Sequence, residues 1–223
     1  PTIMPVAMIT GVEAAGAARL AALLEPALDE ALAPLASAPD PVPPMPLLLG
    51  LPEPVEGEDL APEVTTLVGD RSGTLSEVSS SATGHAAALA ALKDGLALLG
   101  EEQELCLVAG VDSMLEPEAL AREAGEGRIL SGDNPHGFVP GEGAGCLLLA
   151  TAEAAKRLEL PCLGRVLGAA TATEEHTIYG ETVSTGAGLT AAFRGVLEAL
   201  PDGVVQLLTG DMNGQPYRGE EYV

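Results

Sequence analysis

The chain has few aromatic residues and little positive charge. Its 223 residues include no Trp, three Tyr and two Phe. Base-stacking platforms and aromatic cages need such rings, so neither kind of site is expected. Ten Lys and Arg against 33 Asp and Glu give a net charge of -23 at pH 7. This charge repels phosphate backbones and anionic lipids, so we expect no nucleic-acid or membrane partner. It is most simply solvated surface charge, and the alternative is that it steers a partner with a basic patch.

Cysteine is also scarce, since only Cys106, Cys146 and Cys162 occur, each in an apolar run. This odd number suits reduced thiols in a cytoplasm better than a disulfide framework. No cysteine has a His or Cys at zinc-binding spacing, so no metal site is predicted. No apolar run reaches the ~18 residues of a membrane-spanning helix, and residues 1–10 lack the basic start of a signal peptide. We therefore expect a cytoplasmic protein.

The apolar pattern predicts helices alternating with strands. Helical spacing is found at residues 11–37, 85–99, 116–124, 151–158 and 189–200. Continuous apolar runs that predict buried strands are found at residues 47–51, 105–111, 145–150, 162–173 and 204–208. We expect Pro26 to kink or split the first helix, and Asp112, Ser113 and Thr151 to cap helices. The alternation predicts an α/β protein with helices on both faces of a mixed, mostly parallel sheet.

The most distinctive motif is a glycine-rich loop at residues 137–145. Its sequence is Gly137-Phe138-Val139-Pro140-Gly141-Glu142-Gly143-Ala144-Gly145. Four glycines around one acid, leading into an apolar run, predict a tight structural loop before a buried strand. We expect the glycines to allow close backbone approach and positive φ, and Glu142 to accept hydrogen bonds from amides of the turn. The loop lacks the Lys-Ser/Thr end of a P-loop and precedes a strand, so phosphate binding is not predicted.

Three features occur in a fixed order along the chain. They are the turn Ser80-Ser81-Ala82-Thr83-Gly84-His85, the strand Cys106–Asp112 and the glycine-rich loop. In this order they resemble the β-ketoacyl-acyl-carrier-protein synthase family, over roughly residues 75–210. The resemblance implies a thiolase-like layered α/β/α/β/α fold with mixed, mostly parallel sheets, its second half truncated or reduced. It implies a single ketosynthase-like domain over 1–223, with a first half at 1–175 and a partial second half at 176–223.

The resemblance places the family's nucleophile, a cysteine, at Ser81, because Ala82-Thr83-Gly84 is similar to the family's Cys-Ala-Thr-Gly. A serine hydroxyl ionises less readily than a thiol and needs an adjacent base. His85 is a candidate base, and a pocket-lining or capping role is the alternative. The family's two catalytic histidines have no counterpart here, since residues 209–214 lack one and the second motif would lie beyond Val223. His176 matches a structural loop histidine, and we expect His136 to be exposed.

Two functions are compatible with these residues. The first is a catalytically degenerate, ketosynthase-like scaffold or adaptor without the Cys-His-His set, and this is the function we favour. The alternative is an acyltransferase or 3-oxoacyl-acyl-carrier-protein synthase-type enzyme that acts on acyl thioesters through Ser81. No cofactor is expected. The resemblance implies a homodimer and admits an acyl carrier protein as a partner.

Overall fold

The computed structural model describes residues 4–55, 57, 59–69, 74–100, 102–178, 180, 182–200 and 204–222. Their centre is a four-stranded sheet of order β2-β1-β3-β4. Its strands are β1 (Met45–Gly50), β2 (Leu75–Ser81), β3 (Leu105–Ser113) and β4 (Glu142–Ala150). Strand β1 pairs in parallel with β2 and β3, and β4 is antiparallel to β3. The predicted mixed, mostly parallel sheet is therefore confirmed.

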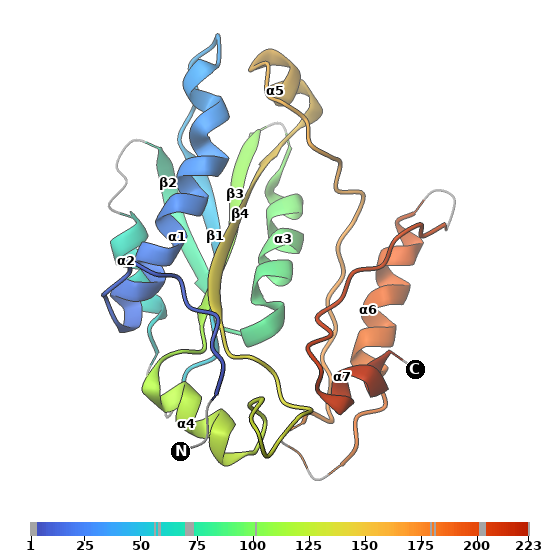
Figure 1. The fold of residues 1–223 in the computed structure, drawn as a ribbon. Helices are drawn as coiled ribbons and strands as arrows, with labels where there is room; N and C mark the ends of the chain where they lie inside the picture. Colours follow the sequence, from blue (N-terminus) through green and yellow to red (C-terminus); the bar gives the residue numbers. More distant parts are fainter. Residues whose placement is uncertain are drawn as a thin grey trace.

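Helices cover both faces of this sheet, as predicted (Figure 1). Helices α1 (Gly16–Leu32) and α2 (Ala61–Gly69) lie on one face, and α3 (Ala87–Leu98) lies on the other. Successive side chains of a strand point to opposite faces, so β3 contributes to two cores. Leu105 and Leu107 join the cluster beneath α1, whereas Cys106 and Val108 join the cluster beneath α3. Burial on both faces explains why β3 is a continuous apolar run.

The remaining helices include those predicted at 116–124, 151–158 and 189–200, and one near the C-terminal end that was not predicted. They are α4 (Pro117–Gly125), α5 (Ala152–Arg157), α6 (Ala187–Glu198), α7 (Pro216–Glu221) and the 3₁₀ helices η1 (Ala33–Ser37) and η2 (Gly84–Ala86). Pro26 does not split α1, because buried leucines on either side of it hold the helix to the sheet. Thr151 caps α5 as predicted, its hydroxyl accepting from the Ala154 amide at 3.1 Å. Asp112 and Ser113 are not caps, because they end β3.

Two predicted strands are wrong. Residues 162–173 and 204–208 form no strand in the structure. Their apolar side chains stay in solvent, with Leu163 99% and Leu207 78% exposed. A run with high β-propensity forms a strand only when a neighbouring strand supplies hydrogen bonds and packing.

None of the described helices is long and apolar enough to span a membrane.

The N-terminal end of α3 lies directly on the sheet because two paired glycines leave room for it. Gly50 of β1 and Gly110 of β3 are register partners. A Cβ at Gly50 would lie 2.3 Å from the Ala88 nitrogen, and one at Gly110 would lie 2.6 Å from the Ala88 Cβ. This contact fixes the preceding turn, including His85, at the carboxyl ends of the parallel strands.

We predict that Gly50→Ala destabilises the fold by about 1 to 3 kcal/mol, because the backbone of α3 would have to move away from β1. Gly100→Ala is the matched control, since a Cβ there has no heavy atom within 4 Å. The control should change stability by less than about 0.5 kcal/mol. Urea unfolding followed by circular dichroism measures both, and equal stability of the two variants would contradict the close contact.

Candidate functional site

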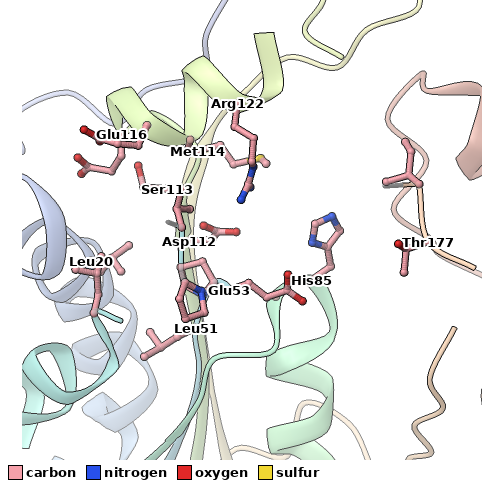
Figure 2. A pocket seen from close by; sticks show the side chains of 18 of the residues that line it. Leu20, Leu51, Glu53, His85, Asp112, Ser113, Met114, Glu116, Arg122 and Thr177 are labelled. Atoms are coloured by element: carbon pink, nitrogen blue, oxygen red, sulfur yellow. The ribbon is translucent and has the colours of Figure 1, made fainter. Parts of the chain in front are cut away.

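A cavity of about 590 Å³ lies where the chain leaves β1 and β3. We call it the edge cavity, and its lining includes Leu51, Glu53, His85, Asp112, Arg122 and Tyr217. Figure 2 shows side chains from the loop after β1, the 3₁₀ turn, the end of β3 and α4 around one space. The carboxyl edge of parallel strands is where open α/β sheets bind ligands. The edge cavity is therefore the candidate functional site.

Beside the edge cavity, the Glu142 carboxylate of the glycine-rich loop is buried in an ion pair. Its side chain is 0% exposed, and its Oε1 accepts from Arg19 Nη2 at 2.6 Å and from the Ile9 amide at 2.9 Å. Its Oε2 accepts from Arg19 Nε at 2.7 Å and from Ser113 Oγ at 2.9 Å. The bond to Arg19 lowers the pKa of Glu142 from its ordinary 4.5 to about 2. The backbone amide that donates to Glu142 thus belongs to the N-terminal segment, whereas the sequence had predicted amides of the turn itself.

The glycines of the loop act through close approach. None of them has a positive φ, so that part of the prediction is wrong. A Cβ at Gly137 would lie 2.2 Å from the Ile129 carbonyl carbon. Phe138 is buried, and the Arg128 guanidinium lies 5.8 Å from its ring centroid. Gly143 and Gly145 belong to β4, whose extended backbone does not require glycine.

Asp112 is the carboxylate at the end of β3, and sequence reasoning did not assign it to a site. Burial raises the pKa of Asp112, and the Ser113 amide, His85 and Arg122 lower that pKa by smaller amounts. In Figure 2 the side chains of Asp112, Glu53 and His85 lie around the same cavity. The signal that could have found Asp112 is its position directly after a buried parallel strand, where ligand-binding residues gather.

The two predicted catalytic candidates lie at the neighbouring turn. Ser81 ends β2, and its Oγ lies 3.3 Å from Thr83 Oγ1 in a hydrogen bond. His85 belongs to η2, is exposed and lines the edge cavity. Within the described residues, Ser81 forms no hydrogen bond with His85. Their catalytic roles stay predictions.

The other histidines lie away from this turn. His136 is exposed, as predicted, and the His176 backbone amide donates to Glu174 Oε1 at 3.1 Å. No group of three or more metal-ligating side chains occurs in the part of the chain that the structure describes.

The cysteines are poor nucleophiles where they are buried. Burial raises the pKa of Cys106 to about 11. Burial and the nearby Cys106 together raise the pKa of Cys146 to about 12. Both thiols lie inside the β3–β4 ladder, where they are register neighbours of apolar residues. Cys162 is exposed. None of the three belongs to the Ser80–His85 turn, so no thiolate is available there.

The comparisons with known proteins that find a match agree on what the chain is similar to. Residues 61–155 match the family model described as "Beta-ketoacyl synthase, N-terminal domain". No curated protein matches the chain. A solved ketosynthase from module 6 of the bacillaene synthase of Bacillus subtilis 168 is 22% identical, with a TM-score of 0.50 over 68% of this chain. A cysteine-to-serine mutant of the same ketosynthase is 20% identical, with a TM-score of 0.53 over 88% of this chain.

These matches confirm the predicted resemblance to the β-ketoacyl synthase family and its thiolase-like fold. The matched region covers only 29% and 37% of the two ketosynthase chains. Our chain thus spans about a third of the length of these neighbours. The family match includes β2, α3, β3 and β4, which are the elements that position the Ser80–His85 turn and the glycine-rich loop.

We predict that Glu142→Gln destabilises the protein by about 3 kcal/mol at pH 7, because the buried Arg19 guanidinium loses its counter-charge. The pKa of Glu142 in the folded chain, about 2, lies below its ordinary 4.5, so its ionisation stabilises the fold above pH 4.5. That contribution is lost as the pH falls from 4.5 to about 2. Urea unfolding across this range should show the wild type and the variant converging. Glu77→Gln, on the exposed face of β2, is the control and should match the wild type.

We also predict that iodoacetamide at pH 8 alkylates Cys162 alone in the native protein. The pKa values of Cys106 and Cys146, about 11 and about 12, keep both thiols protonated at pH 8, and Cys106 is also buried. All three thiols should react after denaturation. Peptide mass spectrometry reads out the labelled sites. Labelling of Cys146 as fast as Cys162 would show that its side chain is open to solvent.

Proposed function

We propose that this chain is a ketosynthase-like scaffold or adaptor that does not catalyse condensation. The observation that carries the proposal is the contact of Ser81, the residue at which the resemblance places the family's nucleophilic cysteine. Its hydroxyl is hydrogen-bonded to Thr83, another weak acid, and among the residues that the structure describes it has no hydrogen bond to a general base. A serine without a base is a weak nucleophile at neutral pH.

The backbone around Ser81 supports the same function. The 3₁₀ helix η2 lies between Ser81 and the first residue of α3. A helix dipole acts mainly within its first turn, so Ser81 gains little from the N-terminal end of α3. The protonated cysteines cannot replace it, because they lie within the sheet. Neither the hydroxyl nor a thiol is activated at this turn.

The surface of the chain suits protein partners. Strand β2 is an edge of the described sheet, and an edge strand presents unpaired backbone groups to another chain. Pairing of two copies there would give a homodimer. The net charge of -23 favours a partner with a basic patch, and an acyl carrier protein is the partner that the resemblance suggests. We place this function in the cytoplasm on the basis of the unpaired cysteines.

The alternative is an enzyme that transfers acyl groups from thioesters through Ser81. Its support is positional, because Ser81 is the last residue of the parallel strand β2 and His85 lies four residues further on. In this case His85 would have to turn toward Ser81 when substrate binds. The single domain over 1–223, with halves at 1–175 and 176–223, belongs equally to both hypotheses.

We predict that acetyl- and malonyl-pantetheine leave no covalent adduct on the purified protein. Within the described part of the chain Ser81 has no hydrogen bond to a base, so attack on the thioester should be negligible. Intact-mass spectrometry detects any acyl group. An adduct that disappears in Ser81→Ala and persists in Ser79→Ala, the matched neighbour on β2, would overturn the scaffold function and establish the enzyme.

A further inference from the structure

The sequence contains two asparagines, and the residues that follow them differ in their chemistry. Asn134 is followed by Pro135, whereas Asn213 is followed by Gly214. The side-chain carbonyl carbon of an asparagine can be attacked by the backbone nitrogen of the next residue. Proline has no amide N–H to lose, and glycine has no side chain to shield its nitrogen. Attack of this kind is therefore open to Asn213 and closed to Asn134.

The structure leaves both reacting groups of the Asn213–Gly214 pair accessible. The two residues are exposed, and Gly214 has a φ of 95°, which favours glycine at this position. Among the residues that the structure describes, no acceptor lies within hydrogen-bond distance of the Gly214 amide. Asn213 Oδ1 accepts from the Gln215 amide at 3.2 Å. That bond draws electrons from Cγ and would stabilise the negative charge that an attack places on Oδ1.

The side chain of Asn134 is held in place by comparison. Its Nδ2 donates to the Gly127 carbonyl at 2.6 Å and to the Ile129 carbonyl at 3.2 Å. Its Oδ1 accepts from the His136 amide at 3.3 Å. The protein thus carries its own unreactive reference for Asn213.

The amide group of Asn213 also supports a buried contact. Its Nδ2 donates at 3.1 Å to Oε1 of Gln215, whose exposed fraction is 6%. The same oxygen accepts from Arg128 Nη2 at 3.5 Å. Gln215 therefore needs a donor at position 213, and a carboxylate there would face it with a second acceptor.

This contact joins the C-terminal segment to the glycine-rich loop. The Arg128 guanidinium lies 5.8 Å from the ring centroid of Phe138 and 6.0 Å from that of Tyr217. A Cβ at Gly214 would lie 3.7 Å from the Gly137 carbonyl oxygen. Tyr217 belongs to α7 and lines the edge cavity. A change at Asn213 can thus reach the wall of that cavity.

We propose that Asn213 is a site of spontaneous modification, at which the side-chain amide is converted to a carboxylate through a cyclic imide. The Gly214 nitrogen loses its proton to solvent and bonds to Asn213 Cγ. The Cγ–Nδ2 bond then breaks, and ammonia leaves after taking up a proton. Water opens the ring at either carbonyl: cleavage of the Cγ–N bond gives aspartate, and cleavage of the backbone C–N bond gives isoaspartate. The sum is one water consumed and one ammonia released.

The modification removes the donor to Gln215 and places a negative charge beside its Oε1. Isoaspartate also adds a methylene group to the backbone directly before α7. Both products therefore loosen α7 from the glycine-rich loop. This reaction does not depend on whether the protein is a scaffold or an enzyme, because it uses neither Ser81 nor acyl chemistry.

Incubation of the purified protein at pH 6 and at pH 8, followed by peptide mass spectrometry, tests the site. The peptide with Asn213 should gain the mass difference between an amide and a carboxyl group, at least about tenfold faster at pH 8, because the deprotonated nitrogen is the nucleophile. Fragmentation should identify isoaspartate among the products. The peptide with Asn134 should stay unchanged. Asn213→Gln should abolish the reaction, since its longer side chain would have to close a larger ring.

The same protein unfolded in urea gives the rate that the local sequence allows. Conversion of Asn213 in the native protein should stay within about tenfold of that rate. Slower native conversion would overturn the proposal, because the fold would then protect the site. Conversion of Asn134 as fast as Asn213, or a rate independent of pH, would overturn it as well.

Limited proteolysis tests the effect on α7. Asn213→Asp is a stable form of one product, and Gln206→Glu adds the same charge at an exposed position. Trypsin should cut after Arg218, whose side chain is 12% exposed, at least about threefold faster in Asn213→Asp than in the wild type. The Gln206→Glu control should stay within about twofold of the wild type. Equal cleavage of Asn213→Asp and the wild type would overturn the link to α7.

Discussion

The buried ion pair of Arg19 and Glu142 is the constraint on which the arrangement of this chain depends. Two charges out of water cost several kcal/mol each unless hydrogen bonds complete them. Here each carboxylate oxygen of Glu142 accepts two hydrogen bonds. Arg19 Nη1 donates to the Val12 and Ala14 carbonyls at 2.6 and 3.1 Å. The pair thus joins the N-terminal segment and α1 to β3 and β4. Since α1 forms a wall of the edge cavity through Gly16 and Leu20, the ion pair also fixes that wall.

The opposite side of the edge cavity depends on a steric condition. Ala88 rests on the Gly50–Gly110 pair, and this contact sets the height of η2 above the carboxyl ends of the strands. One side of the site is therefore held by charge and the other by the absence of two side chains. Both anchors lie in parts of the sheet that are covered by helices, so the turn at Ser80–His85 is exposed but well positioned.

Much of this fold could be predicted from the sequence because burial leaves local patterns. The strand at 105–113 is apolar throughout since helices cover both of its faces. The partner of Glu142 leaves no such pattern, because Arg19 lies 123 residues away and reads locally as one residue of an apolar helix. The runs at 162–173 and 204–208 show the converse, a local pattern without the neighbouring strand it needs. Asp112 was not predicted as a site residue because a polar residue that follows a strand can equally be interpreted as the cap of the next helix.

The two anchors explain how this fold can keep its arrangement when residues of the Ser80–His85 turn change. Neither the Arg19–Glu142 pair nor the Ala88 contact involves Ser81 or His85. A serine at position 81 thus costs the fold little stability, because its hydroxyl is hydrogen-bonded to Thr83. The glycine-rich loop is under the opposite constraint, since a change at Glu142 leaves a buried guanidinium without its counter-charge. Under the scaffold function that we propose, selection would keep the residues of the loop and would allow the residues of the turn to change.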